Sequence, residues 1–130
     1  MKFYVGQYYR SVDYFTKAVL YRDKVAKEKT REHVTNYLFL ALSQFRIGNA
    51  STADKTFNQC ISLSEFVGES CRDLGLMAQA NLALSKVHQG QLKEAAEIGR
   101  KALESAERFY SKVLTSICYY CRYFTPYNKP

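Results

Sequence analysis

The feature that most constrains this chain of 130 residues is a pattern that recurs every 42 residues. Gly6, Gly48 and Gly90 are equally spaced, and similar residue types follow each of them. The shared types are a small residue, a second small residue and an aliphatic residue: Ser11, Ala18 and Val19; Ala53, Cys60 and Ile61; Ala95, Ala102 and Leu103. Upstream, residues 40–43 and 82–85 both read Leu-Ala-Leu-Ser. A repeat of this length indicates an array of similar stacked units.

The chemistry of the repeated positions indicates that each unit is a pair of helices joined by a short turn. Glycine has the backbone freedom that a tight turn after a helix needs. The positions that follow it lie on one face of a helix, and the small residues among them let a neighbouring helix approach closely. The two prolines are Pro126 and Pro130, so residues 1–125 lack the strongest helix breaker. We therefore expect an all-α fold.

The expected helices belong to a single array over residues 1–130. A partial unit at 1–29 holds the end of one helix at 1–5 and a second helix at 8–27. Two complete units follow, 30–69 with helices at 31–47 and 51–66, and 70–108 with helices at 70–88 and 92–107. Residues 109–130 form a partial unit or a capping helix, with a helix at 110–124. Ser51 with Asp54 and Ser70 with Asp73 resemble capping boxes, and Gly68 is expected to cap a helix C-terminus.

The repeated residues resemble those of the tetratricopeptide repeat over nearly the whole chain. The matching positions are Tyr37, Ala41 and Ala83 in the first helices and Ala53, Phe57 and Cys60 in the second. The period of 42 residues is longer than the usual ~34 and is similar to that of kinesin light chain repeats. The resemblance implies a right-handed α-solenoid of antiparallel helix pairs, with HEAT-type arrays as the structural alternative. Gly99 and Gln79 lack the large side chain expected at their positions, which predicts looser packing in the third unit.

The residues that carry enzyme chemistry are sparse. The chain has two histidines, no glycine-rich phosphate loop and no HExxH or GxSxG motif. Cys118-x-x-Cys121 has the spacing of a metal or redox pair, but a structural zinc site normally needs four ligands and a redox motif needs a βαβ context. The sequence therefore predicts a protein that is not an enzyme and holds no cofactor and no metal.

Several features predict an intracellular protein. No window reaches the ~18 apolar residues of a membrane span, and residues 1–6 lack the apolar stretch of a signal peptide. We expect a cytoplasmic location, with the nucleus and the cytoskeleton left open. The net charge of +7 raises the prospect of nucleic acid, but the signs are mixed in residues 22–32, which disfavours it. Tyrosine and phenylalanine cluster near both ends, which predicts a piece of a longer array or a subunit whose ends partners cover.

The resemblance implies that the first helix of each unit lines a concave groove. The expected groove residues are Leu38, Leu42, Phe45 and Arg46 in the second unit and Ala80, Leu84, Val87 and His88 in the third. Leu42 and Leu84 are also compatible with a place in the core, and Arg46 and His88 with simple solvation. The position of Leu42 and Leu84 is occupied by asparagine in the repeats that clamp a carboxylate, which disfavours that subclass.

These observations predict a non-catalytic scaffold or adaptor that binds a peptide or helix of a partner protein in an apolar groove. One alternative is a structural segment of a larger multi-subunit complex. An RNA-binding helical-repeat protein is a weaker alternative, because the paired groove positions supply no base-reading code. We expect no small-molecule substrate and no insertion into a membrane.

Overall fold

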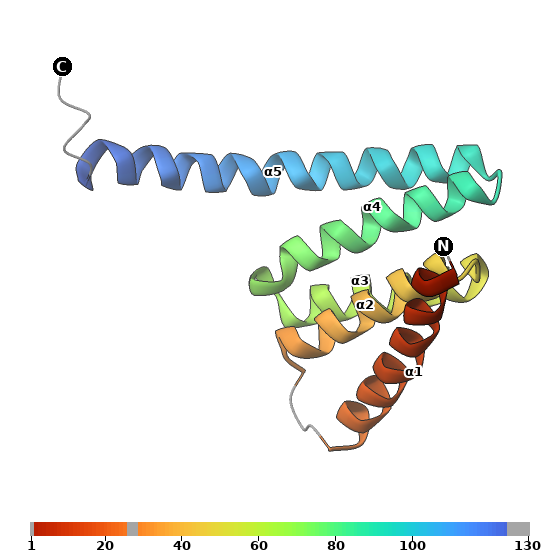
Figure 1. The fold of residues 1–130 in the computed structure, drawn as a ribbon. Coiled ribbons are helices and arrows are strands. Elements are labelled where there is room, and N and C mark those ends of the chain that lie inside the picture. Colours follow the sequence, from red (N-terminus) through yellow and green to blue (C-terminus); the bar gives the residue numbers. More distant parts are fainter. Residues whose placement is uncertain (1, 26–28, 125–130) are drawn as a thin grey trace.

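The computed structural model describes the backbone of residues 2–25 and 29–124 and the side chains of residues 6–25, 29–109 and 111. Within these residues the chain forms five α-helices and one short 3₁₀ helix, and no β-strand (Figure 1). The elements are α1 (Lys2–Val25), α2 (Arg31–Arg46), α3 (Ala50–Val67), η1 (Glu69–Cys71), α4 (Arg72–His88) and α5 (Leu92–Phe124). The prediction of an all-α fold is confirmed for the described residues.

Each α-helix packs against the next one in the chain, and α2 also contacts α4. In Figure 1, α1 crosses α2, which it contacts, and α5 runs along α4 and extends beyond its start. The core lies between α2, α3 and α4, and its buried members are Val34, Leu38, Ala41, Ala53, Phe57, Cys60, Cys71, Leu74, Ala78 and Leu82. In both α2 and α3 these residues are spaced i, i+4, i+7, which places them on one helix face.

The 42-residue repeat is present in the backbone hydrogen bonds of two turns. After α2, the N–H of Gly48 donates to the carbonyl of Phe45, and the next N–H donates to the carbonyl of Gln44, both at 3.0 Å. The equivalent bonds after α4, at Gly90, measure 3.0 and 2.9 Å. This pattern is the Schellman motif, which needs a left-handed residue after the helix. Gly48 and Gly90 supply it with φ angles of 89° and 77°, so the predicted turns at these glycines are confirmed.

The predicted turn at Gly6 is wrong, because α1 continues through this residue from Lys2 to Val25. There is accordingly no separate helix end at 1–5. A glycine inside a helix costs only about 1 kcal/mol relative to alanine, so it permits a turn without imposing one. A Cβ atom at Gly6 would meet no atom within 4 Å, so no close helix contact requires glycine here.

The helix boundary expected near residues 108–110 is also wrong. Residues 92–124 form one helix of 33 residues, α5, in place of separate helices at 92–107 and 110–124. No glycine or proline lies between Gly99 and Pro126, so nothing in the sequence ends the helix earlier. Residues 125–130 lie outside the described residues.

The predicted helix caps are partly confirmed. Gly68 is the C-cap of α3, with a φ of 111°. The two predicted capping boxes are absent, because Ser51 lies inside α3 and Ser70 lies in η1, ahead of α4. The 3₁₀ turn η1 was not expected, and it moves the start of α4 from residue 70 to Arg72.

Small residues allow close packing between neighbouring helices, as the repeat predicted. Ala53 is 0% exposed and Ala95 is 6% exposed. The sequence pattern did not identify a further close approach at Gly75 of α4. A Cβ built there would lie 2.5 Å from Oγ and 3.2 Å from Cβ of Ser64 in α3, so the Ser64 side chain would have to shift to admit any larger residue.

Candidate functional site

The four α2 residues predicted to bind a partner differ in exposure. Leu38 is 1% exposed and belongs to the core with Val34 and Ala41, so its assignment to an accessible surface is wrong. Leu42 and Phe45 are half-buried and pack against the core, with part of each side chain left accessible. Arg46, at the end of α2, is exposed.

The four predicted residues of α4, which are Ala80, Leu84, Val87 and His88, are all exposed. Leu84 is 45% and Val87 48% exposed, large values for aliphatic side chains in a folded chain. Met77, 49% exposed, lies seven residues before Leu84 on the same side of the helix. Sequence reasoning missed Met77, although the spacing of the other residues, extended by one turn, points to it. The exposed stripe on α4 is therefore Met77, Ala80, Leu84 and Val87.

An aromatic contact joins the predicted residues of the two helices. The rings of Phe45 and His88 meet edge to face, with centroids 5.3 Å apart and planes at 77°. The contact lies at the C-terminal ends of α2 and α4, so the apolar side chains of both helices form one surface there. The predicted residues Phe45 and His88 are thus brought together.

The same surface extends toward α1 through residues that the sequence did not single out. Phe39 of α2 is 44% exposed and stacks on Phe15 of α1, with ring centroids 5.6 Å apart. Phe39 lies three residues before Leu42, on the same side of α2. We name this surface the α2–α4 face and define it as Phe39, Leu42, Phe45, Met77, Ala80, Leu84 and Val87, with Arg46 and His88 at one end.

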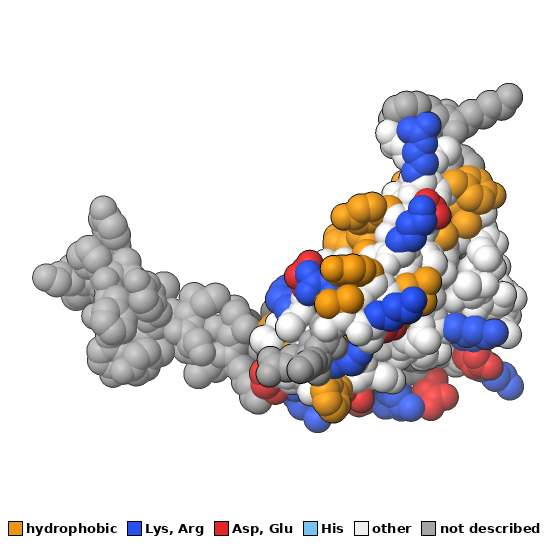
Figure 2. All heavy atoms as spheres, turned by 90° about the horizontal axis from the view of Figure 1, so that it is seen from below, with side chains coloured by type: hydrophobic (Ala, Val, Ile, Leu, Met, Phe, Trp, Pro, Cys, Tyr) orange, Lys and Arg blue, Asp and Glu red, His pale blue; other side chains and the backbone are white. Residues whose placement is uncertain are grey.

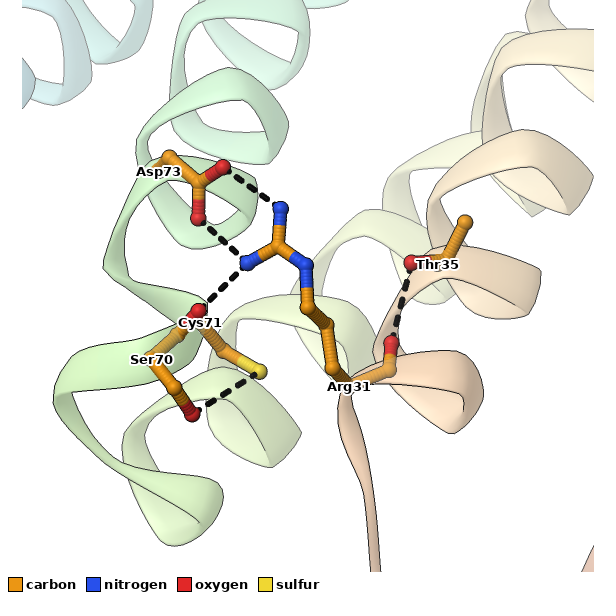
Figure 3. A network of polar contacts seen from close by, with 5 residues as sticks. All are labelled: Arg31, Thr35, Ser70, Cys71 and Asp73. Atoms are coloured by element: carbon orange, nitrogen blue, oxygen red, sulfur yellow. Dashed lines mark hydrogen bonds and ion pairs between the residues drawn. The ribbon is translucent and has the colours of Figure 1, made fainter.

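An ion pair holds the other ends of α2 and α4 together (Figure 3). Arg31 of α2 donates from Nη1 to Oδ1 of Asp73 at 2.8 Å and from Nη2 to Oδ2 at 2.7 Å. Its Nη1 also donates to the backbone carbonyl of Ser70. The hydrogen bonds from Arg31 lower the pKa of the Asp73 carboxyl below its usual value, and the same bonds raise the pKa of Arg31. Both side chains are about half exposed, so the pair mainly orients the helices.

A buried carboxylate fixes the rotation of α4 against α3. Asp54 of α3 accepts hydrogen bonds from Oγ of Ser85 at 2.6 Å and from Nε2 of Gln89 at 2.7 Å. Nζ of Lys86 lies 3.2 Å from the same carboxylate. Desolvation would lower the pKa of Lys86, but the bonds and charges of Asp54 and Glu94 outweigh it, and the net shift is upward. These contacts occupy the side of α4 opposite to Leu84 and Val87, so they turn the exposed stripe outward.

One cleft opens where the third unit lacks its large side chains. It has a volume of about 360 Å³, lies between α3, α4 and α5, and is lined in part by Ser64, Leu76, Gln79 and Ser105. Oε1 of Gln79 is buried without a hydrogen-bond partner in the described part of the chain. A Cβ at Gly99 would meet no atom within 4 Å. These findings agree with the looser packing predicted from Gln79 and Gly99.

A second cleft, of about 440 Å³, lies between the end of α1, α2 and α3. Tyr37 lines it, and its hydroxyl donates to Oδ2 of Asp23 at 3.0 Å. Burial, followed by this hydrogen bond, raises the pKa of Tyr37 to about 12. The described side chains that line the two clefts include the carboxylates of Glu65 and Glu69 in the first and of Asp23 in the second, with no histidine or cysteine.

The described cysteines are buried thiols. Cys60 and Cys71 are free and 0% exposed, and burial, with a smaller effect of Cys71, raises the pKa of the Cys60 thiol to about 12. A thiol in this state is a poor nucleophile. Among the side chains that the structure describes, no three His, Cys, Asp or Glu residues group as a metal site. The side chains of Cys118 and Cys121 lie outside the described residues.

Comparisons with protein-family models, with curated proteins and with solved structures found no significant match to this chain. The arrangement itself defines the chain: paired helices whose turns repeat at 42 residues, with an exposed apolar face on α2 and α4. None of the helices in the described part of the chain combines the length and apolar character that crossing a membrane requires.

Proposed function

We propose that this chain is a non-catalytic scaffold that binds a helix or an extended peptide of a partner protein on the α2–α4 face. We further propose that its helix pairs form a right-handed tetratricopeptide-like solenoid and that it works inside the cell. The observation that carries the binding proposal is the exposed stripe on α4, which includes Leu84 and Val87, beside the half-buried Leu42 and Phe45 on α2.

The composition of this face suits a peptide with apolar anchors. Exposed apolar side chains grouped on one face and bordered by polar residues are typical of a surface that another molecule covers. Arg46 and His88 border the face at one end and offer hydrogen bonds to a partner's polar groups. The two parallel helices leave their apolar residues at helical spacing, which suits a helix or an extended peptide with regularly spaced anchors.

The repeated turns support the solenoid. α2 and α4 end in the same Schellman motif, and α3 and α5 begin 42 residues apart, at Ala50 and Leu92. Similar units that stack in this way form a superhelix with extended surfaces for binding. Cys60 and Cys71 are buried free thiols, which is typical of cysteines in a reducing compartment.

Exposed aliphatic residues on α4 and α5 provide a matched test. Among the proteins that wild type captures from an extract of the native cells, those that bind the α2–α4 face should be lost with Leu84→Asp and Val87→Asp. Leu92→Asp with Leu103→Asp on α5 changes two residues that are more exposed, at 63% and 60%, and should leave capture intact. Circular dichroism and melting should stay close to wild type for both variants, because exposed positions tolerate charge.

The outcome distinguishes the proposal from its alternatives. If both double variants captured the same proteins to the same extent, the binding site would have to lie outside the α2–α4 face. Unfolding of the α4 variant would mean that Leu84 and Val87 stabilise the fold. A chain that serves only as a structural segment of a complex would lose its partners when α1 or α5 is altered, with the α4 variant still bound.

A further inference from the structure

The outer face of α1 carries cations and aromatic rings in alternation. Along one line of the helix lie Arg10, Tyr14, Lys17, Tyr21 and Lys24, all exposed. Tyr14 is 67% and Tyr21 66% exposed. Figure 2 shows hydrophobic and basic side chains interleaved on the face of the molecule that includes α1. We name this line of five residues the α1 seam.

The opposite side of α1 accounts for its packing in the fold. Val19 is buried, and Phe15 stacks on Phe39 of α2. The seam points away from this contact, since Tyr14 and Tyr21 remain two-thirds exposed. Tyr14 also contacts Phe15 edge to face, with ring centroids 5.1 Å apart, so it supports the Phe15–Phe39 pair while most of its ring stays exposed.

The spacing of the seam is that of a helix–helix contact. Its residues follow one another at steps of four, three, four and three, which average 3.5 residues. This is the spacing at which a second helix can lie along the first and stay in contact with it. The distance from Arg10 to Lys24 corresponds to about 21 Å of helix, or four turns, at 1.5 Å per residue.

The charge of the seam determines the charge of its partner. Residues 1–29 contain seven Lys or Arg and three Asp or Glu, whereas residues 30–107 contain eight and nine, so this end of the chain is locally basic. Lys17 pairs with Asp13 at 3.1 Å. Arg10 and Lys24 have no carboxylate partner among the side chains that the structure describes. A partner with acidic residues would pair with the cations of the seam.

The apolar residues beside the seam favour a protein helix over other anionic partners. Leu20 and Val25 are 58% and 59% exposed, and a phosphate chain would not bury them. An anionic bilayer needs apolar residues together at the centre with cations around them, whereas Lys17 and Lys24 lie on the centre line here. A second copy of this chain would place cations against cations.

We infer that the α1 seam docks an acidic amphipathic helix of a partner protein. Its acidic residues lie against Arg10, Lys17 and Lys24, and its apolar residues cover Tyr14 and Tyr21. Tyrosine and arginine are among the residues that contribute most to protein interfaces. The seam borders the α2–α4 face through Phe15, which contacts both Tyr14 and Phe39, so the test below changes seam residues only.

The test uses the full chain and two fluorescent helical peptides of about 21 residues, three heptads each. One peptide presents Leu and Glu along its contact line, and the other presents Leu and Lys. Fluorescence anisotropy should detect binding of the Glu peptide alone. Lys17→Glu with Lys24→Glu should weaken that binding by at least about tenfold and should create binding of the Lys peptide. The control, Lys55→Glu with Lys93→Glu, makes the same change in net charge at exposed positions of α3 and α5 and should change affinity less than about twofold.

Several results would overturn the inference. It fails if the Glu peptide does not bind, or if the control pair weakens binding as much as the seam pair. It also fails if single-stranded oligouridine or anionic phosphatidylserine vesicles bind more tightly than the Glu peptide and Tyr14→Ala with Tyr21→Ala abolishes that binding. If sedimentation showed a dimer of the chain and the same two alanine substitutions converted it to a monomer, the seam would bind a second copy of the chain instead.

Discussion

Replacing the buried carboxylate of Asp54 should destabilise the chain more than any change at an exposed charge. The side chain is 9% exposed and receives two short hydrogen bonds, from Ser85 at 2.6 Å and Gln89 at 2.7 Å. Asp54→Ala removes both and leaves the hydroxyl of Ser85, a residue that is 0% exposed, without its acceptor. We therefore expect the contact between α3 and α4 to weaken.

The size of the effect follows from the bonds lost and the bonds kept. Hydrogen bonds to a charged group contribute about 1.5–3 kcal/mol each, so the two give about 3–6 kcal/mol, and the ion pair with Lys86 at 3.2 Å is lost as well. Part is recovered, because Gln89 keeps its bond to the carbonyl of Ser85 at 3.2 Å and Lys86 keeps Glu94 at 3.4 Å. We expect the free energy of unfolding to fall by about 2–4 kcal/mol for Asp54→Ala, and by about half as much for Asp54→Asn, which retains one acceptor.

Urea denaturation followed by circular dichroism measures this loss. A double-mutant cycle with Ser85→Ala should give a coupling of about 1–2 kcal/mol, because the two side chains contact each other directly. A fall of less than about 0.5 kcal/mol for Asp54→Ala would refute the reasoning, since that is the range of ordinary surface substitutions. The network would then be incidental to how α4 is oriented.

Three further predictions concern stability. Gly48→Ala should lower the free energy of unfolding by about 1–3 kcal/mol in thermal or urea denaturation, because φ is 89° there. Gly6→Ala inside α1 should instead stabilise the chain by about 0.5–1 kcal/mol. If Gly6→Ala destabilised the chain, the result would indicate a turn at Gly6 and contradict the continuous helix. Gly75→Ala should destabilise by about 1–3 kcal/mol through its clash with Ser64. Ser64→Gly in the same chain should recover part of the loss, and full stability of Gly75→Ala alone would mean that the Ser64 side chain moves aside at little cost. The pKa of Tyr37 is raised to about 12, so the folded state favours the neutral phenol. The stability that this preference contributes is present below about pH 10 and is lost as the pH rises to about 12. In denaturation at each pH, wild type should therefore lose more stability over that range than Tyr37→Phe, and equal losses would contradict the assignment.

The features that sequence reasoning predicted correctly are those set by local chemistry. Gly48, Gly68 and Gly90 adopt the positive φ angles that helix ends require. Ala53 and Phe57 lie in the core because their spacing places them on one face of α3. Each of these properties depends on a few neighbouring residues, so the repeated pattern was sufficient to find them.

The errors arose where tertiary packing decides. Leu38 and Leu42 lie four residues apart, on nearly the same side of α2, yet the first is 1% exposed and the second is half-buried. Periodicity cannot separate them, because the position of α3 determines which one is covered. Glycine disfavours a helix interior by only about 1 kcal/mol relative to alanine. The repeated pattern therefore cannot show whether a helix ends at Gly6 or continues through it.

Site-specific photo-crosslinking tests most directly whether the α2–α4 face binds a partner. A photoreactive phenylalanine analogue would replace Leu84 or Val87, and Leu103 on α5 in the control, each at an exposed position. The account predicts that adducts from positions 84 and 87 map to one contiguous segment of one partner and disappear when a synthetic peptide of that segment is added in excess, while position 103 gives none. Adducts that form equally at 103, or that spread over many unrelated proteins and resist competition, would contradict a binding face on α2 and α4.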